Sequence, residues 1–161
     1  MAVTVRDLPV LEYLQRQLAG ALEPGDRTHL RYPTAISRTL GLELVEVGPG
    51  TASVRAVVDS ATHGNQQGTV HGGFLVELAD AAIGTAHSTV MLPGESFASI
   101  DIRAVFLRPV WTDTLIATAR PSHAGRTITH YACKIVRGDG KPVATVTSAV
   151  MTLRGEQAAG R

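Results

Sequence analysis

The amino-acid sequence predicts an α+β domain in which a curved, mostly antiparallel sheet is wrapped around one long helix. One apolar segment, starting near residue 72, has helical periodicity. Most of the chain from residue 42 onward otherwise consists of β-rich runs separated by turns that contain Gly or Pro. A helix set apart from antiparallel strands is typical of the α+β class.

Length and composition restrict the classes of protein that the chain can represent. Its 161 residues, 44% of them hydrophobic, suffice for one core but not for two ordinary domains. The net charge is +1 and the charges are interspersed, so no nucleic-acid-binding or polybasic membrane surface is predicted. No stretch approaches the roughly 18 apolar residues of a membrane span, and the first residues do not resemble a signal peptide. The lone Cys133 excludes a disulfide within the chain, so we expect a core cysteine and a cytoplasmic protein.

The N-terminal residues 1–33 are expected to form a helical extension. Leucines recur at helical spacing from Leu11 to Leu22 until Glu23, Pro24 and Gly25 end the pattern. The main domain is expected to span residues 34–154, starting with a short helix that ends at Gly41. The tail, residues 155–161, is expected to be disordered.

The main domain should contain six strands, with the long helix between the second and the third. The helix follows a polar loop at residues 63–70 and should end near residues 93–94, where Pro and Gly follow each other. The strands are predicted at residues 42–47, 51–59, 97–107, 114–122, 127–137 and 142–153.

The long helix carries two acids on an otherwise apolar surface. On a helical wheel of about 100° per residue, one narrow stripe collects Glu77, Asp80, Gly84, His87 and Ser88. The apolar arc is too wide for a surface helix, so part of this stripe should lie in a crevice or at a subunit interface. An acid in such a place would have a raised pKa. The alternative is that Glu77 and Asp80 form the solvated edge of a half-buried helix.

The junction between the polar loop and this helix is suited to bind an oxyanion. Gly72 and Gly73 allow the backbone to approach a ligand closely. The first N–H groups of a helix are free and lie at the positive end of its dipole. A polarised carbonyl oxygen would therefore be stabilised there.

These residues form a motif that resembles a known family. The run of Asn65, Gly68, His71-Gly72-Gly73 and Asp80, followed by Phe106-Leu107-Arg108-Pro109, is similar to the signature of hotdog-fold acyl-CoA thioesterases of the phenylacetyl-CoA thioesterase (PaaI-like) type. The resemblance covers roughly residues 40–152. It implies a sheet around a central helix, sheets of two subunits joined edge to edge, active sites shared within a homodimer, and a homotetramer built as a dimer of dimers.

The resemblance also implies catalytic roles near the helix. Asp80 would be the general base or the nucleophile toward a thioester carbonyl, and the Gly72 N–H would stabilise the oxyanion. His71 would orient the loop or donate to the thioester, although a His before two glycines is more often structural. Asn65 would hold water or the substrate carbonyl and face Asp80 of the partner subunit, although such an Asn usually serves turn chemistry. Ser99 would position water, although strand alternation alone explains it.

Two arginines could bind the phosphates of coenzyme A. Arg108 precedes Pro109, and Arg126 lies in a Gly-containing turn. Guanidinium groups match phosphate geometry well. The alternative is a pair of solvated arginines at strand ends.

The sequence therefore predicts a hydrolase of aryl or short- to medium-chain acyl-CoA thioesters. No Gly-x-Ser-x-Gly elbow, phosphate-binding loop or zinc-ligand spacing is present, so we expect no metal and no cofactor, with coenzyme A entering only as part of the substrate. One alternative is an acyl-CoA-binding module without turnover. Another is a hotdog dehydratase, whose His and acid normally have a different arrangement from His71 and Asp80.

Overall fold

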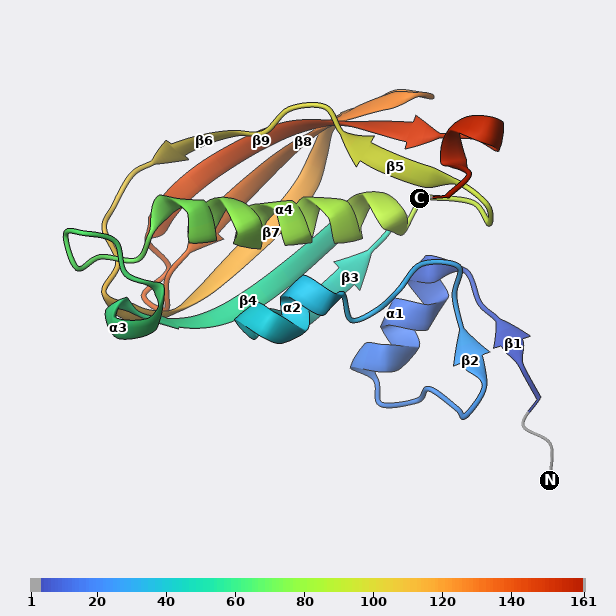
Figure 1. Ribbon diagram of the computed structural model, residues 1–161, viewed down its shortest axis with the longest axis horizontal. Helices are drawn as coiled ribbons and strands as arrows, with labels where there is room; N and C mark the ends of the chain where they lie inside the picture. The colour runs from blue at the N-terminus through green and yellow to red at the C-terminus, as the bar shows by residue number, and fades with distance from the viewer. Residues whose placement is uncertain (1–3, 161) are drawn as a thin grey trace.

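The fold is a curved antiparallel sheet wrapped around a long central helix, in agreement with the predicted class (Figure 1). The computed structural model describes residues 4–160. Helix α4, Gly72–Ser88, lies in the concave face of a 7-stranded sheet with the order β3-β4-β7-β8-β9-β5, and β6 also pairs with β9. The strands are β3 (Glu43–Gly48), β4 (Thr51–Asp59), β5 (Ser96–Ser99), β6 (Arg103–Phe106), β7 (Thr112–Ala124), β8 (Ile128–Val136) and β9 (Pro142–Leu153).

The core lies between α4 and the concave face of the sheet. Alternate residues of β4 and β8 point inward and are buried against Leu78 and Ile83 of α4. Cys133 belongs to this inward-facing set, as predicted, and burial raises the pKa of its thiol to about 12. The sheet thus covers one side of α4, and the other side carries the candidate site.

The predicted strand over residues 97–107 is wrong in one respect, because it is divided into β5 and β6. Between them, the Asp101 carboxylate accepts a hydrogen bond from the Ala149 N–H at 2.7 Å. The Asp101 carbonyl accepts another from the Ser148 hydroxyl at 2.7 Å. These side-chain bonds replace the regular ladder, and both short strands still pair with β9.

Helix α4 ends at Ser88, earlier than predicted. The Ser88 hydroxyl donates to the Thr85 carbonyl at 2.7 Å, and the Thr89 hydroxyl donates to the Ala86 carbonyl at 2.7 Å. Thr89 also accepts a hydrogen bond from the Gly50 N–H at 2.7 Å, which fixes it to the β3–β4 turn. These hydroxyl groups satisfy carbonyls of the last turn before Pro93 is reached.

The N-terminal extension contains helix α1 (Val10–Leu18), which packs against β3. We predicted a helix reaching Leu22, but Gly20 adopts a left-handed conformation with φ of 64°. The Ala21 N–H then donates to the Arg16 carbonyl at 2.8 Å, which closes the helix with a Schellman motif. The short helix α2 (Ala35–Leu40) ends at Gly41, as predicted.

Several short elements were not predicted. Strands β1 (Arg6–Asp7) and β2 (Asp26–Arg27) form a parallel pair beside α1, and helix α3 (Ser60–His63) precedes the polar loop. The tail that we expected to be disordered contains a 3₁₀ helix, Gly155–Ala158, while residue 161 lies outside the described residues. Within residues 4–160, no helix is long and apolar enough to cross a membrane.

Candidate active site

His71 forms the N-cap of α4 and fixes the shape of the junction. Its ring Nδ1 accepts a hydrogen bond from the Gly73 N–H at 2.9 Å, and its backbone N–H donates to the His63 carbonyl at 2.7 Å. These bonds satisfy Gly73 internally, whereas the Gly72 N–H has no hydrogen-bond partner within the described part of the chain. The junction therefore presents a free donor at the N-terminus of a helix, which is the geometry expected for oxyanion binding.

Close packing explains why residue 72 is a glycine. A Cβ built there would lie 2.9 Å from Cζ of Phe106, which is nearer than a normal contact. Phe106 belongs to β6, and 55% of its surface remains exposed. The ring therefore covers the start of α4 while leaving it reachable from outside.

A groove of about 400 Å³ brings together three of the predicted site residues, Asn65, Gly72 and Arg108. The Asn65 side chain accepts from the N–H groups of Gln67 and Thr69, at 2.9 and 3.2 Å, and so serves the turn chemistry considered for it. Arg108 donates to the Pro142 carbonyl at 2.8 Å, which holds it at the rim. We call these three residues the groove half of the site.

Asp80 lies two turns further along α4, next to Ser99. The Ser99 hydroxyl donates to the Asp80 carboxylate over a long 3.5 Å. Burial raises the pKa of Asp80, and the Ser99 hydrogen bond offsets part of this effect. Burial also raises the pKa of Glu77, and the charge of Asp80 adds to that shift. Asp80 and Ser99 form what we call the acid half of the site, and Glu77 is its neighbour.

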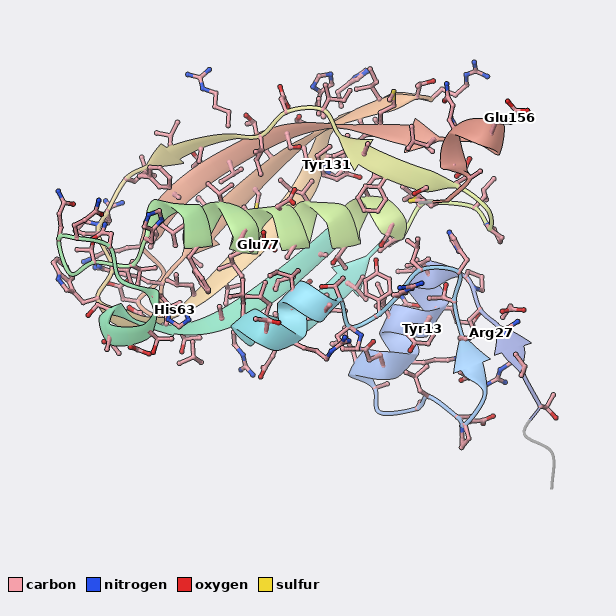
Figure 2. All side chains as sticks on the ribbon, in the orientation of Figure 1. Tyr13, Arg27, His63, Glu77, Tyr131 and Glu156 are labelled. Carbon is pink, nitrogen blue, oxygen red and sulfur yellow. The ribbon has the colours of Figure 1, made fainter. Side chains whose placement is uncertain are left out.

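The predicted polar stripe of α4 is divided by the fold. Glu77, Asp80 and Gly84 remain partly accessible, but His87 and Ser88 are buried. His87 lies against the sheet, between the Tyr131 hydroxyl at 3.2 Å and the Thr152 hydroxyl at 2.9 Å. Tyr131 is labelled in Figure 2 on the sheet behind the C-terminal half of α4, and Glu77 near its middle. Helical spacing alone could not show that His87 and Ser88 are buried while Thr85 of the same turn stays partly accessible.

The two halves of the site are well separated within one protomer. Gly72 and Asp80 are eight residues apart on one helix, which corresponds to about 12 Å. No single carbonyl group can contact both of them.

The two predicted arginines are also far apart. The backbone N–H of Arg108 donates to the carbonyl of Val143 near the start of β9. Arg126 precedes Thr127, whose carbonyl accepts a hydrogen bond from the backbone N–H of Thr152 at the end of β9. The span from residue 143 to residue 152 of a strand is about 30 Å, so one protomer cannot direct both guanidinium groups at neighbouring phosphates.

Comparisons with known proteins agree with this architecture. The family model of the thioesterase superfamily matches residues 67–144. A 1,4-dihydroxy-2-naphthoyl-CoA hydrolase of Listeria monocytogenes is 33% identical over 102 residues, which cover 62% of this chain and 80% of that protein. The PaaI protein of the E. coli phenylacetic acid degradation operon superposes with a TM-score of 0.73 and 28% identity, covering 90% of this chain and 97% of that one. A mutant PaaI from Thermus thermophilus gives a TM-score of 0.68 and 31% identity over 73% of this chain and 98% of that one.

The sheet wrapped around α4, the thioesterase family model and the hydrolase relative together identify a hotdog-fold thioester hydrolase. The chain belongs to the thioesterase superfamily, and PaaI proteins are among its structural relatives.

Proposed function

We propose that the protein hydrolyses acyl-CoA thioesters at sites shared between two copies of the chain. The 12 Å separation between Gly72 and Asp80, about eight helical residues, supports this proposal, because one thioester must meet both an oxyanion donor and an acid. A two-fold axis that sets two α4 helices antiparallel brings the groove half of one protomer beside the acid half of its partner. Two such dimers would make the tetramer.

The exposed edge of the sheet supports the pairing of two copies. Strands β5 and β6 form the last row of the sheet, and large apolar side chains are exposed along it, among them Ile100, Val105 and Phe106. An exposed apolar edge strand is a template for pairing with another strand. Edge-to-edge pairing would cover these side chains and continue the sheet across the dimer.

The chemistry follows from the environment of Asp80. Its carboxylate is half-buried and its pKa is raised, so it is a better proton acceptor than an exposed aspartate. In the water-mediated route it takes a proton from water, and the resulting hydroxide attacks the thioester carbon. The Gly72 N–H of the other protomer donates to the oxyanion that forms. The C–S bond then breaks, and the thiolate receives the proton from Asp80.

A direct route uses the same groups. The Asp80 carboxylate attacks the thioester carbon, the thiolate of coenzyme A leaves, and water hydrolyses the mixed anhydride. A single turnover in ¹⁸O-labelled water separates the routes when water opens the anhydride at its aspartyl carbon. In the direct route, the carboxylate released in the first turnover contains only unlabelled oxygen, and hydrolysis of the anhydride at its aspartyl carbon places the label on Asp80. In the water route, the carboxylate released in the first turnover already carries the label.

The remaining residues act in support of these two. Asn65 and His71 order the loop that aims the Gly72 N–H, and Ser99 holds the Asp80 carboxylate. Arg108 borders the groove of one protomer, and Arg126 of the partner subunit approaches from the opposite side in the antiparallel dimer. Both would bind phosphates of coenzyme A, while the acyl group would be aryl or short- to medium-chain.

The half-buried carboxylate of Asp80 beside Ser99 is the observation that carries this proposal. Its test is thiol release from a panel of aryl- and alkanoyl-CoA thioesters by the parent and by Asp80→Asn, which keeps the shape and removes the base. We expect hydrolysis by the parent and a fall of about 10²–10⁴-fold in the variant. A parent that releases no thiol from any thioester of the panel would contradict the proposal.

Subunit mixing tests whether the site is shared. Asp80→Asn and Gly72→Pro should each be nearly inactive alone. After unfolding and refolding of a one-to-one mixture, half of the dimers are mixed, and one of their two sites retains both groups. Roughly a quarter of the parent activity should therefore return. Activity that stays at the level of the separate variants would contradict a shared site.

A further inference from the structure

A hollow of about 340 Å³ lies in the N-terminal part of the chain, outside both halves of the site described above. Helix α1 supplies Tyr13 to its wall, and the segment from β2 to α2, residues 27–38, supplies the rest. Figure 2 labels Tyr13 on α1 and Arg27 on the neighbouring β2. No residue of the groove half or of the acid half lines this hollow, so it is a separate candidate site.

The wall of the hollow is positively charged. It contains Arg27, Arg31 and Arg38, and no Asp or Glu is among the described residues that line it. We call it the arginine hollow. All three arginines are exposed, so a dissolved anion can reach them and would be attracted there.

The ion pairs of the N-terminal extension leave two of these arginines without a partner charge. All the acids within residues 4–33 form ion pairs with arginines of the same segment. The acids are Asp7, Glu12, Glu23 and Asp26, and the arginines are Arg6, Arg16 and Arg27. In contrast, Arg31 and Arg38 form no ion pair within residues 4–160. The arginine hollow therefore holds two guanidinium charges that no carboxylate of the described chain neutralises.

Hydrogen bonds show which donors of the arginine hollow remain available. Arg38 donates through Nη1 to the Pro33 carbonyl at 2.8 Å, which fixes its guanidinium group beside a residue of the wall and leaves its other N–H groups free. The Arg31 guanidinium and the Tyr13 hydroxyl form no hydrogen bond within the described part of the chain. Two guanidinium groups and one hydroxyl are thus available to an anion.

We propose that the arginine hollow binds a phosphate monoester. Such a group carries a charge of about −1.5 to −2 at pH 7 and three strong acceptor oxygens, which matches two uncompensated guanidinium groups and one hydroxyl. A carboxylate carries only one charge and would match this wall less well. Leu30 and Tyr32 also line the hollow and would contact the organic part of the ester. The inference does not depend on the proposed thioesterase activity, because the two sites share no residue.

The test measures the dissociation constant of phenyl phosphate by titration calorimetry at low ionic strength, with benzoate as the singly charged comparison. The parent should bind phenyl phosphate more tightly than benzoate, and added salt should weaken the binding. Arg31→Gln should weaken the binding of phenyl phosphate about tenfold, because it removes a charged donor. The matched control is Arg120→Gln, since Arg120 is also exposed but lies on β7 and does not line the hollow, and the dissociation constant should not change there.

A second variant removes a donor without changing the charge. Tyr13→Phe keeps the ring and deletes the hydroxyl, so the binding of phenyl phosphate should weaken about fivefold. Thermal unfolding checks that each variant is folded. The proposal would be overturned if the parent showed no saturable binding in the millimolar range, or if the parent, Arg31→Gln and Tyr13→Phe all bound phenyl phosphate equally. Thioester hydrolysis that persists without phosphate binding would leave the proposed function intact.

Coenzyme A and dephospho-coenzyme A identify the source of the phosphate group, since only the first carries a 3′-phosphate monoester. If the arginine hollow takes this group, Arg31→Gln should weaken the binding of coenzyme A about tenfold and leave that of dephospho-coenzyme A unchanged. If the variant binds both as the parent does but binds phenyl phosphate more weakly, the ligand is a separate phosphate ester. Either outcome supports a phosphate site in the hollow.

Discussion

The Gly72 N–H can be removed without disturbing the helix that presents it. Gly72 is the first residue of α4, a position where proline is favoured because its N–H would have no intrahelical partner. The preceding His71 has φ of −63° and ψ of 134°, which is the conformation that a residue before proline adopts. Gly72→Pro therefore deletes one donor and retains the backbone path.

The contact with Phe106 must be relieved in the same experiment. Any side chain at residue 72 places its Cβ 2.9 Å from Phe106 Cζ, so the ring has to move by several tenths of an ångström. In a Phe106→Leu background the ring is absent. Gly72→Ala in that background is then the matched control, because it adds the Cβ and keeps the N–H.

The two variants should differ in activity and not in stability. Loss of one oxyanion-hole donor typically costs about 10²–10³-fold in rate, equivalent to about 2.7–4 kcal/mol, and we expect this loss for Gly72→Pro relative to Gly72→Ala. Proline at a compatible position restricts the unfolded chain, so the midpoint of thermal unfolding should be unchanged or slightly higher. Thiol release and calorimetry measure the two effects. Equal activity of the proline and alanine variants would refute the assignment of this N–H as the oxyanion donor.

Four further outcomes follow from the ionisable and buried groups. Asp80→Asn should raise the midpoint of thermal unfolding at neutral pH. Because the pKa of Asp80 is raised in the folded protein, the buried charge destabilises the fold as the pH rises above about 4. Calorimetry across pH should show that the gain in the variant vanishes in acid. Ser99→Ala should move the acidic limb of the pH–rate profile to higher pH, because the hydrogen bond that lowers the pKa of Asp80 is lost; an unshifted limb would exclude Asp80 as the titrating group. Tyr131→Phe should lower the free energy of unfolding by about 1 kcal/mol in a denaturant titration, because it removes the hydroxyl bonded to His87. Burial lowers the pKa of His87, so the neutral ring stabilises the fold above about pH 6.5, and this stabilisation is lost as the pH falls. In His87→Gln, the free energy of unfolding should therefore depend less on pH in the acid range, as unfolding curves would show.

The elements that the sequence predicted well are those defined by local signals. The last strand has the predicted bounds, Pro142–Leu153, because β-rich residues run between two clear breaks. The short helix ends at Gly41, whose φ of 65° is a local requirement. The first helix ends at Leu18, before the predicted Leu22, because the left-handed conformation of Gly20 stops it despite the leucine spacing.

The interruption of the edge strand could not be predicted from local sequence. It depends on hydrogen bonds between Asp101 and residues 148 and 149, more than forty positions away. The buried position of His87 has the same origin, because Tyr131 and Thr152 come from distant strands. Periodicity placed this side chain on the correct face of the helix but could not show what covers it.

For the candidate site, the sequence provided the residues and the structure provided their spacing. The motif contains Gly72 and Asp80 close together in the chain, and helical geometry sets them about 12 Å apart. The separation of Arg108 from Arg126 required the register of β9. The arginine hollow depends on how residues 27–38 pack against α1, which has no signature in the sequence.

The contact between Phe106 and Gly72 links the proposed dimer edge to the proposed oxyanion donor. The ring belongs to the exposed edge row of the sheet, and the same ring covers the first residue of α4. In the proposed dimer, a substitution of Phe106 that alters how two copies meet therefore also alters the space around Gly72, the proposed oxyanion donor. A change in quaternary structure through this edge would then be accompanied by a change in turnover.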